Sequence, residues 1–248
     1  MGKGKRNLLV AALWIGIWAL VSRMVALPIL LPSPLLTAQT LLRLWTTVEF
    51  WLSVGASLLR ITAGFLTGAV LGLLLAVACS WSQTINNIFT PFKTLIRSTP
   101  ITSFIILVLL WIHIDYVPVF ISMLTVLPIV WQNTQQGIAQ VDGDLLEMAR
   151  AYAFPNRRVL QHIYVPSVLP YFYTACATSM GFAWKSGIAA EVIAKPLHSI
   201  GRSLQDTKVY LLTDELFAWT LTVVLLSLLL ESVLRRLISP TTPERIQS

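Results

Sequence analysis

The stretch VDGDLLEMARAYAFPNRRVLQHIYVP, residues 141–166, decides how this chain folds and what surrounds it. It is polar and rich in arginine, although long apolar runs flank it on both sides. Asp144, with Glu147 three residues later, predicts the start of a short helix through an acidic version of the capping box. Pro155 disfavours helical geometry at Phe154, so this first helix should end there.

A second short helix should follow within the same stretch. Proline suits the first helical position, so this helix should begin at Pro155 and run to about Tyr164, before Pro166. Two short helices that meet at a corner between membrane spans are suited to docking another protein rather than to catalysis. The apolar face of the first helix should consist of Leu145, Leu146 and Ala149.

The same stretch resembles the cytoplasmic EAA loop of permease subunits in binding-protein-dependent ABC importers. That motif reads Glu-Ala-Ala, a Gly six residues after the Glu, and Ile-x-Leu-Pro about ten residues beyond. The positions that match it are Glu147, Ala149, Ile163 and Pro166. Other positions depart from it, because Met148 replaces an Ala, Ala153 replaces the Gly and Val165 replaces the Leu. An ordinary amphipathic loop between helices is the alternative interpretation.

The departure at Ala153 bears most on local structure. Glycine would permit a left-handed backbone corner, which alanine resists by about 1 kcal/mol. We therefore expect a tighter helix at Ala153, with the bend set by Pro155 instead.

The composition excludes a soluble globular domain, because the 248 residues are 56% hydrophobic and 12% charged, with a mean hydropathy of +0.73. Apolar runs long enough to cross a bilayer predict an all-α polytopic membrane protein with about six transmembrane helices. The net charge is +7, but the basic residues are scattered between apolar spans and fit topology signals and anionic lipid better than nucleic acid. Cys79 and Cys176 lie far apart in apolar sequence and should be small buried hydrophobes.

The apolar runs also predict the order of the spans. We expect spans at residues 8–27, 55–80, 100–112, 117–136, 167–194 and 214–234. Residues 37–54 should lie along the outer interface, and residues 81–97, with Lys93 and Arg97, should form a cytoplasmic connection. Residues 195–213 should lie outside and contain a turn at Gly201.

Basic residues set the expected orientation. Lys3, Lys5 and Arg6 precede the first span, and Arg235 and Arg236 follow the last, so both termini should be cytoplasmic. The predicted division is an N-terminal transmembrane helix plus outer interfacial segment at residues 1–54, a core permease domain at residues 55–238 with its coupling loop at 141–166, and a cytoplasmic tail at residues 239–248.

A row of small residues marks the predicted second span as a packing helix. Gly64, Gly68 and Gly72 repeat every four residues, so another helix should approach closely along them. Arg60 interrupts this row near the outer end, where it can snorkel or pair with an acid. The segment also resembles the matching helix in the nitrate, sulfonate and taurine branch of these permeases.

Catalytic and nucleotide-binding motifs are missing from the sequence. It contains no GxxxxGK[ST] phosphate loop, no HExxH and no GxSxG, and His113, His162 and His198 are isolated from one another. We therefore expect neither an enzyme nor a metal site, and no cofactor on this chain. The resemblance implies that ATP and Mg²⁺ bind a separate ATPase partner.

The candidate transport pathway lies in the fifth predicted span. Lys185 in mid-span costs roughly 2.5–3.5 kcal/mol, so it should face protein or a wet cavity, where it would suit an anionic substrate. Glu191 lies about 9 Å along the helix and about 120° around it, which argues against a direct pair with Lys185. Trp184 and Glu191 match a Trp and a later Glu in the family's fifth span, and Glu191 would lie at the outer gate. A structural pairing or snorkelling of Lys185 is the alternative.

The resemblance implies a permease subunit of the bacterial inner membrane that works with a second permease subunit, ATPase subunits and an extracytoplasmic binding protein. The ATPase-coupling residues would be Asp144, Leu145, Leu146, Glu147, Ala149, Arg150, Tyr152, Ala153, Arg157 and Arg158. It also suggests a small anion or sulfonate as substrate, such as nitrate, an alkanesulfonate or taurine. The alternatives are a membrane-embedded enzyme and a self-powered secondary transporter, which needs internal repeats and half-helices that the sequence does not show.

Overall fold

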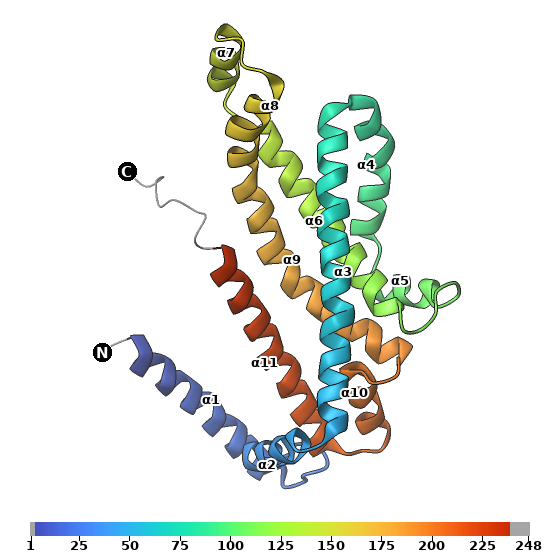
Figure 1. Ribbon diagram of the computed structural model, residues 1–248. Helices are drawn as coiled ribbons and strands as arrows, with labels where there is room; N and C mark the ends of the chain where they lie inside the picture. The colour runs from blue at the N-terminus through green and yellow to red at the C-terminus, as the bar shows by residue number, and fades with distance from the viewer. Residues whose placement is uncertain (1–2, 239–248) are drawn as a thin grey trace.

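The computed structural model describes residues 3–238, and the regular elements in that range are all helices (Figure 1). In chain order they are α1 (Lys3–Val25), α2 (Pro34–Trp45), α3 (Val48–Trp81), α4 (Gln83–Ser98), α5 (Ile101–Val108), α6 (Val117–Ala139), α7 (Gly143–Ala151), α8 (Asn156–Val159), the π-helical turn η1 (Leu160–Tyr164), α9 (Val165–Ala194), α10 (Ile200–Val209) and α11 (Thr213–Ile238). The predicted all-α class is confirmed, and the predicted tail at residues 239–248 lies outside the described range.

Long helices dominate the arrangement. Within residues 3–238, α3, α6 and α11 are long and apolar enough to cross a membrane, and α1 carries a shorter apolar stretch at Leu9–Val25. α9 has 30 residues and extends about 45 Å, more than the roughly 30 Å of a bilayer's hydrocarbon core. In Figure 1, α7 and α8 lie at one end of the molecule, the α7 end, and α2 and α10 lie at the other, the α10 end.

The contact between α3 and α6 confirms the predicted packing role of the glycine row. A Cβ atom added at Gly68 would lie 2.7 Å from the Met123 carbonyl oxygen, and one at Gly72 would lie 2.8 Å from that of Leu127. Gly64 faces α6 in the same way. Because lipid supplies no hydrophobic drive between helices, this close backbone approach holds the two helices together by van der Waals packing.

The main apolar core joins α3, α6, α9 and α11. Ile61, Val126, Trp184 and Trp219 are buried in it. The Trp184 indole also donates a hydrogen bond from Nε1 to the Val223 carbonyl oxygen (3.0 Å), which ties α9 to α11. The faces of four helices therefore meet around Trp184 inside the subunit.

Residues 37–54, expected along the outer interface, contain the end of α2 and the start of α3. α3 begins with Thr47 as its N-cap, whose hydroxyl accepts a hydrogen bond from the Phe50 amide. This bond satisfies an amide that helix geometry leaves without a partner, so a new helix starts directly after α2. α3 then runs unbroken through Gly55, and the expected boundary between residues 54 and 55 falls inside it.

The third predicted crossing, at residues 100–112, was also wrong. α5 has 8 residues and is about 12 Å long, too short to cross a bilayer. The expected cytoplasmic connection forms α4 instead, which the Ser82 hydroxyl caps and which packs against α3 and α6. α4 and α5 are half-helices separated at Thr99 and Pro100, because a residue before proline is held in extended geometry.

Candidate functional site

The predicted coupling loop forms a protruding segment at the α7 end (Figure 1). We call residues 141–159, which include α7 and α8, the projection. Its charged side chains are exposed: Asp142, Asp144, Glu147, Arg150, Arg157 and Arg158. Within residues 3–238, no ion pair joins these arginines to a carboxylate. The structure therefore brings the predicted coupling residues together on one accessible segment.

Asp142, and not Asp144, caps α7. Its carboxylate accepts a hydrogen bond from the Asp144 amide (2.9 Å). This start makes Glu147 the fifth residue of α7, beyond the third position that a capping box requires, so the predicted capping box was wrong. Asp144 keeps a favourable place in the first turn, where the helix dipole stabilises negative charge.

The corner after α7 is a Schellman motif centred on Ala153. The Phe154 amide donates to the Ala149 carbonyl oxygen (2.9 Å). The Ala153 amide donates to the Arg150 carbonyl oxygen (3.0 Å), and Ala153 has a φ of 49°. The expectation of a tighter helix at Ala153 was therefore wrong. The left-handed corner costs about 1 kcal/mol for alanine, and hydrogen bonds worth about 1 kcal/mol each offset that cost.

An apolar surface covers one side of the projection. Its members are Leu145, Met148, Tyr152 and Phe154, which are 40%, 43%, 72% and 39% exposed. Ala149, expected on the apolar face of the first helix, is buried, and Leu146 is only half-exposed. The sequence analysis does not assign Met148 and Phe154 to this surface, although residues 145, 148 and 152 have the spacing of one helix face. Large apolar side chains gathered on a protruding surface are typical of a protein-binding site.

The projection joins α9 without an intervening loop. α8 continues through η1 into α9, so the expected helix end before Pro166 and the expected span start at Ser167 were wrong. A proline ring clashes with the carbonyl of a regular preceding turn, and the wider π-helical turn gives Pro166 room. Helical backbone therefore runs unbroken from Asn156 in the projection to Ala194 at the end of α9.

At the α10 end of α9, Glu191 is completely buried. Its Oε2 accepts hydrogen bonds from the Ser57 hydroxyl (2.7 Å) and the Gly201 amide (3.1 Å). Its Oε1 lies 3.8 Å from Nη1 of Arg60. The Ser57 hydroxyl in turn accepts a hydrogen bond from the Ile200 amide (3.0 Å). We call Ser57, Arg60, Glu191 and Gly201 the Glu191 network, which links α3, α9 and α10.

Arg60 pairs as the sequence predicts. Its guanidinium donates hydrogen bonds to the carbonyl oxygens of Leu197 (2.8 Å) and His198 (3.0 Å), and it lies 3.4 Å from the Asp115 carboxylate. It also lies within ion-pair distance of Glu191, so it contacts two acids, Asp115 and Glu191. Arg60 is therefore a satisfied cation that closes the loop after α9.

The predicted turn at Gly201 was wrong. Ser199 caps α10 by accepting a hydrogen bond from the Arg202 amide (3.1 Å), so Gly201 lies in the first turn of that helix. A Cβ atom added at Gly201 would overlap Glu191. The glycine is thus a site of close approach between α10 and α9.

Lys185 alone among the predicted pathway residues lies on the surface of the described chain. Trp184 and Glu191 are buried inside it and each binds a neighbouring helix of the same subunit, so their place on a pathway stays a prediction. Lys185 is exposed on a stripe of α9 with Thr178 and Phe182. In residues 3–238 it has no hydrogen bond or ion pair with another side chain, so its role in a pathway stays a prediction.

The cations expected in a cytoplasmic connection lie on α4 and contact α6. Nζ of Lys93 lies 4.7 Å from the centroid of the Trp131 ring, a cation–π contact, and 3.4 Å from Oε1 of Gln135. Arg97 donates a hydrogen bond to Oε1 of Gln132. α4 therefore places polar side chains along a spanning helix.

The helical fold and its projection define a class of membrane transport subunit. Residues 68–241 match the family described as "Binding-protein-dependent transport system inner membrane component", and the chain belongs to that family. It is therefore an inner-membrane permease of an ABC importer. This membership confirms the prediction of a transporter subunit over those of an enzyme and of a self-powered transporter.

Individual relatives are named as permeases too. The chain is 27% identical to the "Putative aliphatic sulfonates transport permease protein SsuC" of Bacillus subtilis, over 94% of this chain and 84% of that protein. It is 25% identical to the taurine transport system permease protein TauC of Escherichia coli, over 91% and 84% of the two chains. The bicarbonate transport system permease protein CmpB of Synechococcus elongatus is 26% identical, over 63% of this chain and 56% of its own length.

Solved structures share the fold. A crystal structure of an amino acid ABC transporter with histidines superposes with a TM-score of 0.61 at 16% identity, covering 76% of this chain and 91% of that one. An inward-facing conformation of the MetNI methionine ABC transporter gives a TM-score of 0.59 at 14% identity, covering 78% and 94%. The predicted type I ABC importer permease fold is thereby confirmed.

Proposed function

We propose that this permease imports a small anion and that an ATPase subunit docks on its projection in the cytoplasm. A second permease subunit completes the pathway, and the partner ATPase holds ATP and Mg²⁺. In this arrangement both termini are cytoplasmic, and the α10 end faces the extracytoplasmic binding protein that delivers the substrate.

The observation that carries the docking proposal is an ordered projection whose apolar side chains remain uncovered. The rings of Tyr152 and Phe154 lie with their centroids 6.3 Å apart and can fill an apolar groove on the ATPase. Glu147 and Arg150 stand beside them and can form polar contacts at the rim of that groove. Aromatic anchors surrounded by polar contacts are the usual composition of a protein interface.

The helical path from the projection explains how ATP hydrolysis would act at a distance. Closure of the ATPase pair would displace the projection as a rigid body, because η1 joins it to α9 without a flexible linker. α9 would carry the displacement about 40 Å to the Glu191 network, which includes the start of α10. The permease would thus exchange between outward-open and inward-open states as the ATPase opens and closes.

The proposed substrate is a small anion, with a sulfonate as the leading candidate. The relatives named above are assigned to aliphatic sulfonates, taurine and bicarbonate in their own names. Lys185, an exposed cation on α9, supports the same choice, because a mid-span lysine needs an acid, water or an anionic ligand beside it.

Charge reversal on the projection tests the docking proposal. We expect Glu147→Arg and Arg150→Glu, each in the full transporter in nanodiscs, to lower binding-protein-stimulated ATPase activity by about tenfold. A lost charge-assisted contact costs about 1.5 kcal/mol, which corresponds to that factor. The same variants should retain less ATPase subunit when tagged permease is purified in mild detergent.

Lys208→Glu is the matched control for ATPase retention, because Lys208 is also exposed but lies on α10 at the opposite end of the molecule. It should retain the ATPase as the parent does. Full ATPase retention and full stimulated activity in both projection variants would refute docking at the projection.

A further inference from the structure

The interruption between α4 and α5 lies at the surface of the described chain, where Ser98 and Pro100 are exposed and Thr99 is half-buried. α4 starts beside the end of α3, and its 16 residues carry the chain back by about 24 Å before the break. Thr99 is extended there, with ψ of 131°, and Pro100 has no amide hydrogen to donate. Backbone that leaves helical geometry at membrane depth is tolerated where it is buried in protein or lines a water-filled cavity.

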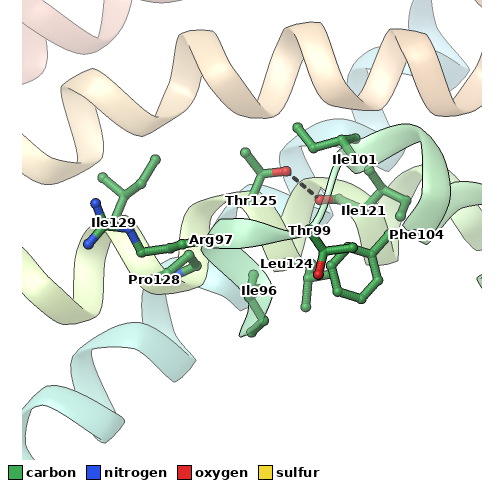
Figure 2. A pocket seen from close by; sticks show the side chains of 10 residues that line it. All are labelled: Ile96, Arg97, Thr99, Ile101, Phe104, Ile121, Leu124, Thr125, Pro128 and Ile129. Carbon is green, nitrogen blue, oxygen red and sulfur yellow. Dashed lines mark hydrogen bonds between the residues drawn. The ribbon is translucent and has the colours of Figure 1, made fainter. Parts of the chain in front are cut away.

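A cavity borders this interruption. Its volume is about 180 Å³, and it lies between the α4–α5 segment and α6 (Figure 2). Phe104, Leu124 and Pro128 contribute to an apolar wall, and Arg97, Thr99 and Thr125 contribute polar groups. Because a water molecule takes about 30 Å³ in the liquid, this space suits several waters or one small oxyanion with a short apolar group.

Arg97 is the charged group of the cavity, and its guanidinium is largely unsatisfied. Its hydrogen-bond partner within the described residues is Gln132, and no carboxylate of residues 3–238 pairs with it. An arginine has five N–H donors in a planar fork that matches two oxygens of a carboxylate, sulfonate or phosphate. Arg97 therefore has donors left over at one edge of the cavity, where Figure 2 shows its guanidinium beside Ile129.

Two other cations, Arg60 and Lys93, have their partners within the chain, whereas Lys185, exposed on α9, has none among residues 3–238. Arg60 meets Asp115, Glu191 and backbone carbonyl oxygens, and Lys93 lies on the Trp131 ring. Arg97 has neither an acid nor an aromatic face of this kind. Arg97 is exposed, so its remaining donors are open to water or to an anionic ligand.

The cavity also touches the helix that we propose as the lever. Thr125, on its wall, lies with its hydroxyl oxygen 3.1 Å from that of Ser186 on α9. Ser186 directly follows Lys185 in the sequence. A shift of α9 against α6 would therefore change the shape of the cavity.

We propose that this cavity is an oxyanion-binding site on the transport pathway, in which Arg97 binds the sulfonate or equivalent anionic group and the apolar wall contacts a short aliphatic portion. The site rests on the proposed function, because it names where the small anion is held within the permease. It is distinct from the projection, where the ATPase docks.

Cysteine labelling tests the site in the full chain. Thr125→Cys would be exposed to two methanethiosulfonate reagents of similar size, one with an ethylsulfonate group and one with an ethyltrimethylammonium group. We expect Arg97→Gln to lower the ratio of the anionic to the cationic reaction rate by about tenfold, because a unit charge a few ångströms away affects the two reagents in opposite directions by about threefold each, even in water. Arg97→Lys should preserve the ratio, since the charge remains.

The controls separate the local effect of Arg97 from a change in folding. Thr90→Cys lies on the same helix, about 10 Å before Arg97, so its ratio should hardly change at 0.1 M salt. The parent chain sets the background, because Cys79 and Cys176 are buried. Ethanesulfonate, added as a soluble competitor, should slow the anionic reagent at Thr125→Cys with Arg97 present and not with Arg97→Gln.

An unchanged ratio in Arg97→Gln, or no reaction of Thr125→Cys with either reagent, would overturn the site. Labelling requires neither the ATPase nor the binding protein. Failure of the cavity proposal is therefore distinguishable from failure of ATPase docking, which only the projection variants report.

Discussion

At its α10 end, α9 places Glu191 among groups that all belong to the same chain, whereas at its α7 end it continues into a projection whose rings and charges point outward. The carboxylate of Glu191 is buried, accepts two hydrogen bonds and lies beside Arg60. The projection instead leaves Tyr152 and Arg150 uncovered and holds Ala153 in a left-handed corner.

The two ends of α9 differ in what their polar groups bind: those at the α10 end bind the same chain, and those at the α7 end remain available to another protein. A buried carboxylate must be satisfied within the fold, since an unpaired buried charge costs several kcal/mol. An exposed segment has no such requirement and can keep side chains available for another protein. The two ends should therefore respond to mutation in opposite ways: stability should depend on the α10 end, and coupling should depend on the α7 end.

The largest expected effect is that of Glu191→Ala, which leaves Arg60 and the Gly201 amide without their carboxylate. We expect a loss of about 3–5 kcal/mol in stability, as for other buried pairs with one partner removed. Thermal unfolding in detergent, followed by fluorescence-detected size exclusion, measures it. Glu147→Ala on the projection is the control and should change stability by less than about 0.5 kcal/mol. Equal losses for the two glutamates would break the comparison.

A glycine at each end allows a matched substitution of intermediate effect. Gly201→Ala should destabilise by about 1–3 kcal/mol, because the added methyl group overlaps Glu191 in a packed site. Gly143→Ala should be neutral or stabilise by up to about 1 kcal/mol, because nothing lies within 4 Å of its added Cβ and alanine favours helix. The same unfolding measurement applies. A neutral Gly201→Ala would show that α10 does not pack on α9 as closely as described.

The smallest expected effect concerns the corner at Ala153. Ala153→Gly should raise stability by at most about 0.5 kcal/mol, because relief of left-handed strain is partly offset by greater freedom of the unfolded chain. Ala153→Val should instead speed hydrogen exchange at the Phe154 amide, since a β-branched residue rarely adopts positive φ. Exchange measured by mass spectrometry reports this local opening. Equal protection in the valine variant would argue against the left-handed corner.

Sequence reasoning succeeded where a pattern is local and dense. The glycines of α3 predicted a close helix contact, and the Pro155 corner predicted a projection between spans. It failed where neighbouring residues compete for one role. Asp142 and Asp144 can each cap a helix, and the choice of Asp142 shifted Glu147 out of the capping box.

Polar residues outside dense patterns were the least predictable. The sequence predicts Lys93 and Arg97 in a cytoplasmic connection, but it does not reveal their partners Trp131, Gln135 and Gln132, which come from a helix that follows later in the chain. The half-helices were missed for the same reason. A helix that packs on another spanning helix through polar side chains has no continuous apolar run to reveal it.

The amino-acid sequence by itself determined an all-helical membrane protein, its small-residue packing helix and the polar segment between spans, because apolar length, glycine spacing and proline act over a few turns of chain. Tertiary structure decided which polar groups are satisfied internally and which stay available. The sequence alone does not reveal that Glu191 is buried and hydrogen-bonded. Its donor Ser57 lies 134 residues away in the sequence, and only the fold brings the two together. Burial and pairing are sums over distant neighbours, so no local pattern contains them.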